Sequence, residues 1–229
     1  PYKIKCTLWR EGDKAIFDFA GTDPQAQSSV NFFLNEDMFK MFFGSFTINV
    51  VDPQIVFNDG FYDLVDVRIP EGTLLKPKYP AALSGRTHAL GRIFDILGAL
   101  LGMGAPEMML SAAGFYDSPH LFYSGYDKKG EWFQLFQIGF GGVPGRPVGD
   151  GPDGHSLWPG FTNVPNEFIE SYFPLLIERY ETIPDSGGAG LHRGGNGLSV
   201  AYRFLADGEI GIHDERWLTY PWGVLGGET

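Results

Sequence analysis

The sequence predicts an α+β fold with a β-rich core, few helices and glycine-rich loops. Three observations support this class. Segments in which apolar and polar residues alternate outnumber segments with helical periodicity. Turn-forming residues punctuate the whole chain, which contains 32 Gly and 16 Pro. Hydrophobic residues make up 43% of the 229 residues, enough to fill a substantial core.

The N-terminal half begins with two predicted strands, Tyr2–Trp9 and Ala15–Phe19, in which apolar and polar residues alternate. Glu11-Gly12-Asp13 separates them and predicts a hairpin turn. Three further elements are expected in this half: a buried helix at Glu36–Thr47, a turn at Asn58-Asp59-Gly60 and a strand at Val65–Ile69.

The clearest helical pattern covers Ser84–Gly102. Its apolar residues follow the i, i+3, i+4, i+7, i+11 spacing of one helix face, at Leu90, Ile93, Phe94, Leu97 and Leu101. Beyond it we expect a short helix at Pro165–Tyr172, with Ala206-Asp207-Gly208 as the final hairpin turn. The remaining predicted strands are Met108–Phe115, His120–Tyr126, Glu131–Phe140, Leu175–Ile183, Leu198–Leu205 and Glu209–His213.

Composition narrows the classes of partner. The formal net charge is −11 and no Lys/Arg cluster is present, so nucleic acid is not an expected partner. No apolar run approaches the ~20 residues of a membrane-spanning helix, so no membrane partner is expected. The single cysteine, Cys6, allows no internal disulfide, which fits a reducing compartment and favours a cytoplasmic location. We expect residues 1–229 to be a single structural unit, truncated at both ends from a longer subunit.

Residues able to carry chemistry gather in Phe140–Gly197, where polar side chains alternate with many glycines. Glycine permits close approach of backbones, so the stretch predicts loops folded tightly around a site, with a series of structural turns as the alternative. His155 is flanked by Asp150 and Asp153. It fits a general base oriented by a carboxylate, a metal ligand, or a loop histidine bound to backbone.

Asp185-Ser186-Gly187-Gly188 resembles a nucleophile or an anion-binding nest of backbone amides, although a tight turn capped by Asp185 fits equally. It has neither P-loop spacing nor a Gly-x-Ser-x-Gly elbow. Arg146 and Arg193 suit recognition of an oxyanion, and Trp158 suits an apolar cavity or the core. The candidate catalytic residues are therefore His155, Asp153 and Asp185; the candidate substrate- or anion-binding residues are Arg146, Ser186, Gly187, Gly188, Arg193 and Trp158; no metal ligand is assigned.

Asp185–Gly197 reads Asp-Ser-Gly-Gly-Ala-Gly-Leu-His-Arg-Gly-Gly-Asn-Gly and resembles the hydantoinase B family. That family comprises B subunits of ATP-dependent N-methylhydantoinases, the corresponding half of 5-oxoprolinase, and subunits of acetone and acetophenone carboxylases. Further blocks similar to the family are Phe17–Thr22 with Asn31, Pro70–Thr73, Pro80–Ala82 with Gly85-Arg86, Asp150-Gly151, Pro165-x-Glu167, Glu170-x-x-x-Pro174, and Pro221–Gly223 with Gly226-Gly227.

The resemblance implies the C-terminal part of a B-type subunit in a hetero-oligomer. ATP would be bound mainly by the partner, a hydantoinase A-type subunit of the actin/acetokinase fold. A divalent metal would be held by ligands that precede this segment. The family chemistry is activation of a small-molecule carbonyl substrate by phosphoryl transfer. Arg146, Arg193 and the Gly187–Gly190 amides would suit an anionic intermediate, and His155 or Asp153 would suit proton transfer.

The substrate is less constrained. Where oxoprolinase-type members have a Thr-Asn-Thr-x-Asn-Thr-Pro-type block, this chain has His155–Pro165, with Trp158 and Phe161. Bulky aromatic residues favour a more apolar ligand, and the context is nearer the acetophenone carboxylase type. Ketone carboxylation is therefore the preferred interpretation. ATP-dependent hydrolysis of a cyclic amide and a non-catalytic scaffold remain the alternatives.

Overall fold

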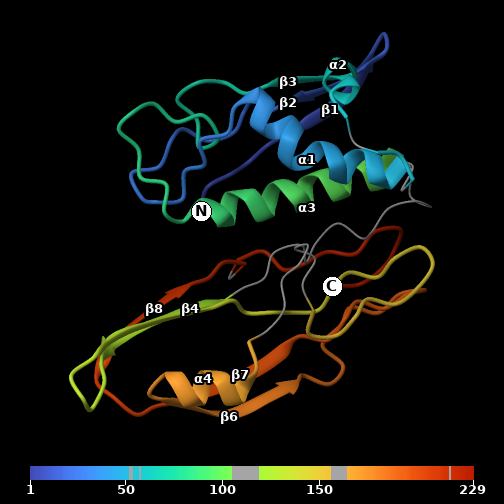
Figure 1. The fold of residues 1–229 in the computed structure, drawn as a ribbon. Coiled ribbons are helices and arrows are strands. Elements are labelled where there is room, and N and C mark those ends of the chain that lie inside the picture. Colours follow the sequence, from blue (N-terminus) through green and yellow to red (C-terminus); the bar gives the residue numbers. More distant parts are fainter. Residues whose placement is uncertain (52–53, 57, 105–118, 156–163, 217) are drawn as a thin grey trace. The chain divides into compact units, whose positions relative to one another are not determined.

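The computed structural model describes residues 1–229 except 52–53, 57, 105–118, 156–163 and 217. The chain divides into two compact units, residues 1–109 and 110–229. Within the described residues, helices and small sheets are mixed in each unit, which confirms the α+β class (Figure 1). The expectation that residues 1–229 act as a single structural unit stays a prediction.

The first unit is built on a three-stranded sheet in the order β1-β2-β3. β1 (Thr7–Glu11) and β2 (Lys14–Asp18) form the predicted hairpin, with Gly12 at a φ of 61° in the turn. Glycine adopts this left-handed conformation without a Cβ penalty. β2 pairs in parallel with β3 (Val65–Arg68). A parallel pair requires a long crossover, so the chain between these two strands must leave the sheet and return.

That crossover contains α1 (Glu36–Val51) and α2 (Gly60–Leu64), and α3 (Arg86–Gly104) follows the sheet. α1 and α3 lie next to each other on one side of the sheet (Figure 1). The predicted helices at 36–47 and 84–102 are thus confirmed with shifted ends. α2 begins within the predicted turn at Asn58-Asp59-Gly60 and was missed, because a single helical turn carries too few residues to show a period.

Phenylalanine rings join the helices of the first unit to its sheet. Phe39 of α1 lies 5.3 Å from Phe17 and 5.5 Å from Phe19, measured between ring centroids. Phe43 lies 4.7 Å from Phe94 of α3 in an edge-on arrangement. All five rings are buried, and tilted or edge-on pairs stabilise beyond their buried area. The high Phe content of the sequence is therefore partly explained by this core.

The second unit contains a sheet in the order β5-β4-β8 and a separate two-stranded sheet, β6-β7. All strand pairs in these sheets are antiparallel. α4 (Asn166–Tyr172) precedes β6, as predicted. The strands are β4 (His120–Tyr126), β5 (Trp132–Gln137), β6 (Leu175–Thr182), β7 (Leu198–Phe204) and β8 (Gly208–His213).

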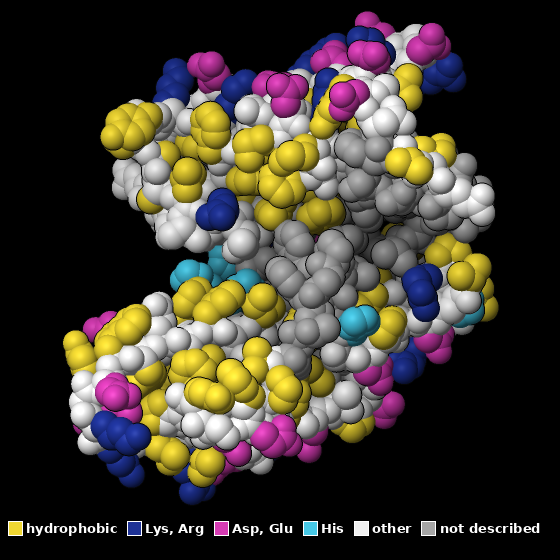
Figure 2. Space-filling view, viewed as in Figure 1, with side chains coloured by type: hydrophobic (Ala, Val, Ile, Leu, Met, Phe, Trp, Pro, Cys, Tyr) yellow, Lys and Arg dark blue, Asp and Glu magenta, His cyan; other side chains and the backbone are white. Residues whose placement is uncertain are grey.

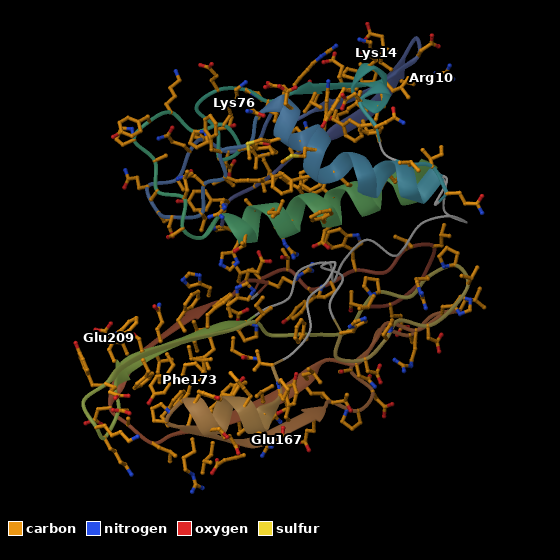
Figure 3. The ribbon with its side chains drawn as sticks, viewed as in Figure 1. Arg10, Lys14, Lys76, Glu167, Phe173 and Glu209 are labelled. Carbon is orange, nitrogen blue, oxygen red and sulfur yellow. The ribbon has the colours of Figure 1, made fainter. Side chains whose placement is uncertain are left out.

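The core of the second unit centres on Tyr123 of β4, which is 1% exposed and packs with Ile169 of α4 and Leu175 of β6. Its hydroxyl donates a 2.7 Å hydrogen bond to the Ala206 carbonyl, and burial raises the pKa of the phenol. Phe173, labelled in Figure 3, follows α4 and packs against the same cluster. One phenolic hydroxyl therefore ties β4 to the chain that leaves β7.

Two predictions were wrong. Ala206-Asp207-Gly208 is not a hairpin turn, because β7 pairs with β6 whereas β8 pairs with β4. The turn carries the chain from one sheet to the other. The strand predicted at Tyr2–Trp9 begins only at Thr7. Before that point the side chains of Asp23 and Thr22 accept hydrogen bonds from the amides of Lys3 and Lys5. These two amides therefore donate to side chains and not to a neighbouring strand.

The predicted strand at Met108–Phe115 lies outside the described residues. Within the described part of the chain, no helix combines the length and the apolar character needed to cross a membrane. Figure 2 shows acidic and basic side chains interspersed with apolar ones on the visible surface. Lys76, labelled in Figure 3, forms one of the ion pairs of the first unit, with Nζ 2.8 Å from Glu36 Oε1.

Candidate functional site

Three glycine-rich segments of the second unit run against one another: residues 141–155, 185–197 and 223–228. Val143 lies where the first two meet. Its amide donates to Pro152 O at 3.0 Å, and its carbonyl accepts from Gly195 N at 2.8 Å. Glu228 N donates to Ala189 O at 2.8 Å and joins the third segment to the second. Backbone hydrogen bonds therefore hold these loops together outside the regular sheets.

Glycine is required where these backbones touch. A Cβ on Gly142 would overlap the carbonyl oxygen of Gly195, and a Cβ on Gly195 would overlap that of Pro152. Neither position can accept a side chain unless a hydrogen-bonded backbone moves. Close approach of backbones, as the sequence predicted, therefore accounts for these two glycines. The backbone that each glycine approaches belongs to another loop of the same unit.

The carboxylate of Asp153 contacts two residues of the 185–197 segment, Arg193 and Asn196. Its Oδ1 accepts 2.8 Å hydrogen bonds from Arg193 Nη1 and from the Asn196 amide, and its Oδ2 accepts from Asn196 Nδ2 at 3.3 Å. The hydrogen bond from Arg193 is the main factor that holds the pKa of Asp153 below its ordinary value. The same contact raises the pKa of Arg193. At neutral pH the two form a charged pair.

Arg193 uses only one nitrogen of its guanidinium in these contacts. Nη1 donates to Asp153 Oδ1 and to Gly194 O, both at 2.8 Å. Within the described residues, Nε and Nη2 have no hydrogen-bond partner, and 43% of the side chain is exposed. The described contacts thus hold the guanidinium through Nη1 alone, in a side chain that is partly exposed.

Asn196 links the turn at Ser186 to this pair. Its Oδ1 accepts hydrogen bonds from the amides of Ser186 and Gly187, both at 3.1 Å. The Ser186 hydroxyl donates to Ile183 O and accepts from Gly197 N at 2.9 Å. The Gly187 amide that was a candidate anion donor therefore already has an internal acceptor. The Ser186 hydroxyl is likewise occupied in closing the turn.

Asp150 contacts three basic residues, Arg193, His192 and Arg146. Its Oδ1 accepts from the Arg193 amide at 3.1 Å and lies 3.5 Å from His192 Nδ1. Arg146 Nη2 donates weakly to the Asp150 carbonyl at 3.4 Å. The structure thus brings Arg146, Asp150, His192 and Arg193 together from two segments.

Other candidates lie less centrally. His155 is exposed, and its amide donates to Gly141 O at 2.7 Å, while within the described residues its imidazole has no hydrogen-bond partner. Asp153 faces Arg193 and Asn196 instead, so the structure does not bring it to His155.

Asp185 is exposed, with a left-handed φ of 56° that begins the Ser186 turn. Gly188 O accepts from Gly194 N at 2.9 Å. Trp158 lies outside the described residues.

Within the described residues, no group of three or more His, Cys, Asp or Glu side chains is placed to hold a metal ion. The expectation that such a metal is held by residues outside this segment stays a prediction.

The hydantoinase B/oxoprolinase family model matches residues 1–229. The chain belongs to the hydantoinase B/oxoprolinase family. The resemblance predicted from Asp185–Gly197 and the other blocks is thereby confirmed. It extends over both compact units of this hydantoinase B-family chain.

The chain is similar to two relatives and to one solved structure, described next. An uncharacterized protein from Methanocaldococcus jannaschii is 32% identical over 217 residues, which are 93% of this chain and 37% of that protein. The putative B subunit of a D-/L-hydantoinase from a Pseudomonas species is 27% identical over 233 residues, 99% of this chain and 39% of that protein. Nucleotide-free acetone carboxylase has a TM-score of 0.75 at 20% identity, over 92% of this chain and 29% of that chain. At that identity the last similarity shows the fold alone.

Two family-like blocks of the first unit meet at Asn31, which is fully buried. Its Oδ1 accepts from Ala26 N at 2.7 Å, and its Nδ2 donates to the carbonyls of Ala26, Ser28 and Ala82 at 2.9 to 3.1 Å. Ala82 belongs to the Pro-Ala-Ala block. In this hydantoinase B-family chain the asparagine thus joins two loops of the first unit.

Sequence reasoning missed the contribution of Asn196. It stands in the Gly-Gly-Asn-Gly segment of the family motif. The glycines there give the stronger sequence signal, because glycine indicates an unusual backbone conformation. A usable signal was present: an amide side chain among glycines can accept and donate at once, and so can bridge two loops. Asn196 does this, since it contacts Asp153 on one side and the Ser186 turn on the other.

Proposed function

We propose that this chain is part of the B-type subunit of an ATP-dependent enzyme that activates a carbonyl substrate by phosphoryl transfer. The observation that carries the proposal is the family match over residues 1–229. ATP supplies the phosphoryl group, and a hydantoinase A-type partner holds the nucleotide. The glycine loop at Asp185–Gly190 lacks the Lys-Ser/Thr of a P-loop, which supports placing the nucleotide on the partner.

In this proposal Arg193, assisted by Arg146, binds the anionic intermediate. The partial exposure of its side chain, the absence of a partner for Nε and Nη2 within the described residues, and the hydrogen-bonded loops that hold Nη1 support that role. Gly188 and the Ser186 turn shape the backbone beside it. His155 is the candidate for proton transfer, because its imidazole is exposed. Asp153 suits proton transfer less well, since Arg193 holds the pKa of its carboxyl below its ordinary value.

The reaction we favour is ketone carboxylation. Bicarbonate accepts the phosphoryl group of ATP, and ADP leaves. The ketone loses an α-proton to a base, and the resulting enolate attacks the carbon of the phosphorylated bicarbonate, so that a carbon–carbon bond forms and phosphate is released. The sequence context supports this choice: Gly-Arg-Pro-Val-Gly-Asp-Gly at Gly145–Gly151 and His-Ser-Leu-Trp at His155–Trp158 are nearer the acetophenone carboxylase type.

The second candidate is hydrolysis of a cyclic amide. In that reaction ATP phosphorylates the amide oxygen, a first water adds to the carbon, and the ring C–N bond breaks to leave an acyl phosphate. A second water then hydrolyses the acyl phosphate to the carboxylic acid and releases phosphate. The Pseudomonas relative, named as a putative hydantoinase component, matches 99% of this chain, and this observation supports the alternative.

The test is ATP consumption by the full-length protein together with its A-type partner. The panel contains acetone, acetophenone, 5-oxoproline and hydantoin, each with and without bicarbonate. We expect ATP use that requires both a ketone and bicarbonate. ATP use with a cyclic amide alone would replace the carboxylase assignment with the hydrolase. Failure of every substrate to stimulate ATP use would contradict both and favour a scaffold.

A further inference from the structure

The guanidinium of Arg193 is fixed on one side and open on the other. Both hydrogens of Nη1 are directed to oxygen, one to Asp153 Oδ1 and one to Gly194 O. Three N–H donors, one on Nε and two on Nη2, have no partner within the described residues. Nε and Nη2 form the edge that binds two oxygens of a carboxylate or phosphoryl group in parallel.

The fixed side depends on Asp153 and Asn196. Asn196 donates to both oxygens of Asp153, from its backbone amide at 2.8 Å and from Nδ2 at 3.3 Å. It thereby orients the carboxylate that orients the guanidinium. Its Oδ1 is in turn anchored by the amides of Ser186 and Gly187. A continuous series of hydrogen bonds thus runs from the Ser186 turn to Arg193.

We propose that Asp153 and Asn196 are positioning residues, which orient Arg193 so that its Nε and Nη2 edge binds an oxyanion of the substrate or activated intermediate. This inference rests on the proposed function and deepens it by naming how the oxyanion is held. Asp153 then has no part in proton transfer. Its charge balances Arg193, and its geometry leaves the bidentate edge of the guanidinium free.

The physical reason is pre-organisation. A long arginine side chain in solvent samples many rotamers, and each must be given up when a ligand binds. At this site the folded loops restrict the side chain beforehand, so less entropy is lost on binding. Lysine cannot substitute, because an ammonium group lacks two parallel donors in a fixed plane.

The test is a double-mutant cycle in the full-length protein with its partner, using the substrate that stimulates ATP consumption. The variants are Arg193→Ala, Asn196→Ala and the combination, and kcat, KM and the thermal midpoint are measured for each. Asn166→Ala is the matched control, because within the described residues its side chain has no hydrogen-bond partner. We expect Asn196→Ala to lower kcat/KM about tenfold, the effect of losing one hydrogen bond that supports a charged group.

In the combination, kcat/KM is expected to be no lower than in Arg193→Ala alone, because Asn196 acts through Arg193. Independent effects that multiply would overturn the positioning role while leaving the proposed function intact. If Asn196→Ala fails to fold, Asn196→Asp takes its place in the cycle. It keeps the Oδ1 acceptor for the Ser186 turn and replaces the Nδ2 donor with a carboxylate oxygen, which repels Asp153 Oδ2.

Unchanged kcat/KM in Arg193→Ala would overturn the oxyanion contact, although continued ATP-dependent turnover would still support the enzyme assignment. Wild-type protein that uses no ATP with any substrate would instead overturn the proposed function, and this inference with it. Arg193→Lys provides a further check, since it is expected to remain as defective as Arg193→Ala.

Discussion

Gly142→Ala is expected to lower the free energy of unfolding by about 3 kcal/mol, the upper end of the usual cost of overpacking. The new methyl group would overlap the carbonyl oxygen of Gly195. That oxygen belongs to backbone, and the neighbouring Gly195 amide is hydrogen-bonded to Val143 O at 2.8 Å. Relief therefore requires the two loops to separate, which removes hydrogen bonds as well as the overlap.

Gly141→Ala is the control for this variant. It changes the adjacent residue in the same way, yet a Cβ at Gly141 would meet no described atom within 4 Å, and its φ is not left-handed. Thermal and chemical unfolding of the full-length protein would be compared for both variants. Equal stability of Gly141→Ala and Gly142→Ala would show that the loops do not cross as closely as described.

Asn31→Ala is the second substitution with a large expected effect, a loss of about 3 kcal/mol in the free energy of unfolding. The side chain is fully buried and makes four hydrogen bonds to backbone, so its removal leaves an amide and carbonyls unsatisfied away from water. Each unsatisfied buried group costs about 1–3 kcal/mol, and partial entry of water limits the total.

Gln27→Ala controls for the loss of an amide side chain in the same loop. Gln27 is exposed, and within the described residues its side chain has no hydrogen-bond partner. Its removal is expected to change the unfolding free energy by less than about 0.5 kcal/mol. A loss in Asn31→Ala no larger than in Gln27→Ala would contradict the role of Asn31 as the link between the loops at Ala26 and Ala82.

Local patterns sufficed for the elements that one segment can define by itself. Alternation located β2, and apolar spacing located α3, in which Ile93 and Leu97 are fully buried as predicted. Pairing between segments was not accessible in this way. The β7–β8 connection resembles a hairpin turn, but Gly208 packs against β4 and the chain changes sheet there.

In the candidate site, too, local composition was predictable from the sequence, whereas contacts between distant segments were not. The sequence located the glycines and the charged residues in one stretch, and the structure brings Arg146, Asp150 and Arg193 together. It did not pair Asp153 with Arg193, because 40 residues separate them and no local rule relates two loops at that distance. Nor did it distinguish a free backbone amide from one already taken, as Gly187 is by Asn196.

Transfer of oxygen from the activated substrate to phosphate tests the central claim most directly. The full-length protein and its partner would be given ATP, a ketone and ¹⁸O-labelled bicarbonate, and the released phosphate would be analysed by mass spectrometry. Activation of bicarbonate by phosphoryl transfer predicts ¹⁸O in phosphate, in proportion to ketone carboxylated, because the phosphate leaves with an oxygen that bicarbonate contributed. Phosphate whose added oxygen comes only from water, while carboxylation proceeds, would contradict the account.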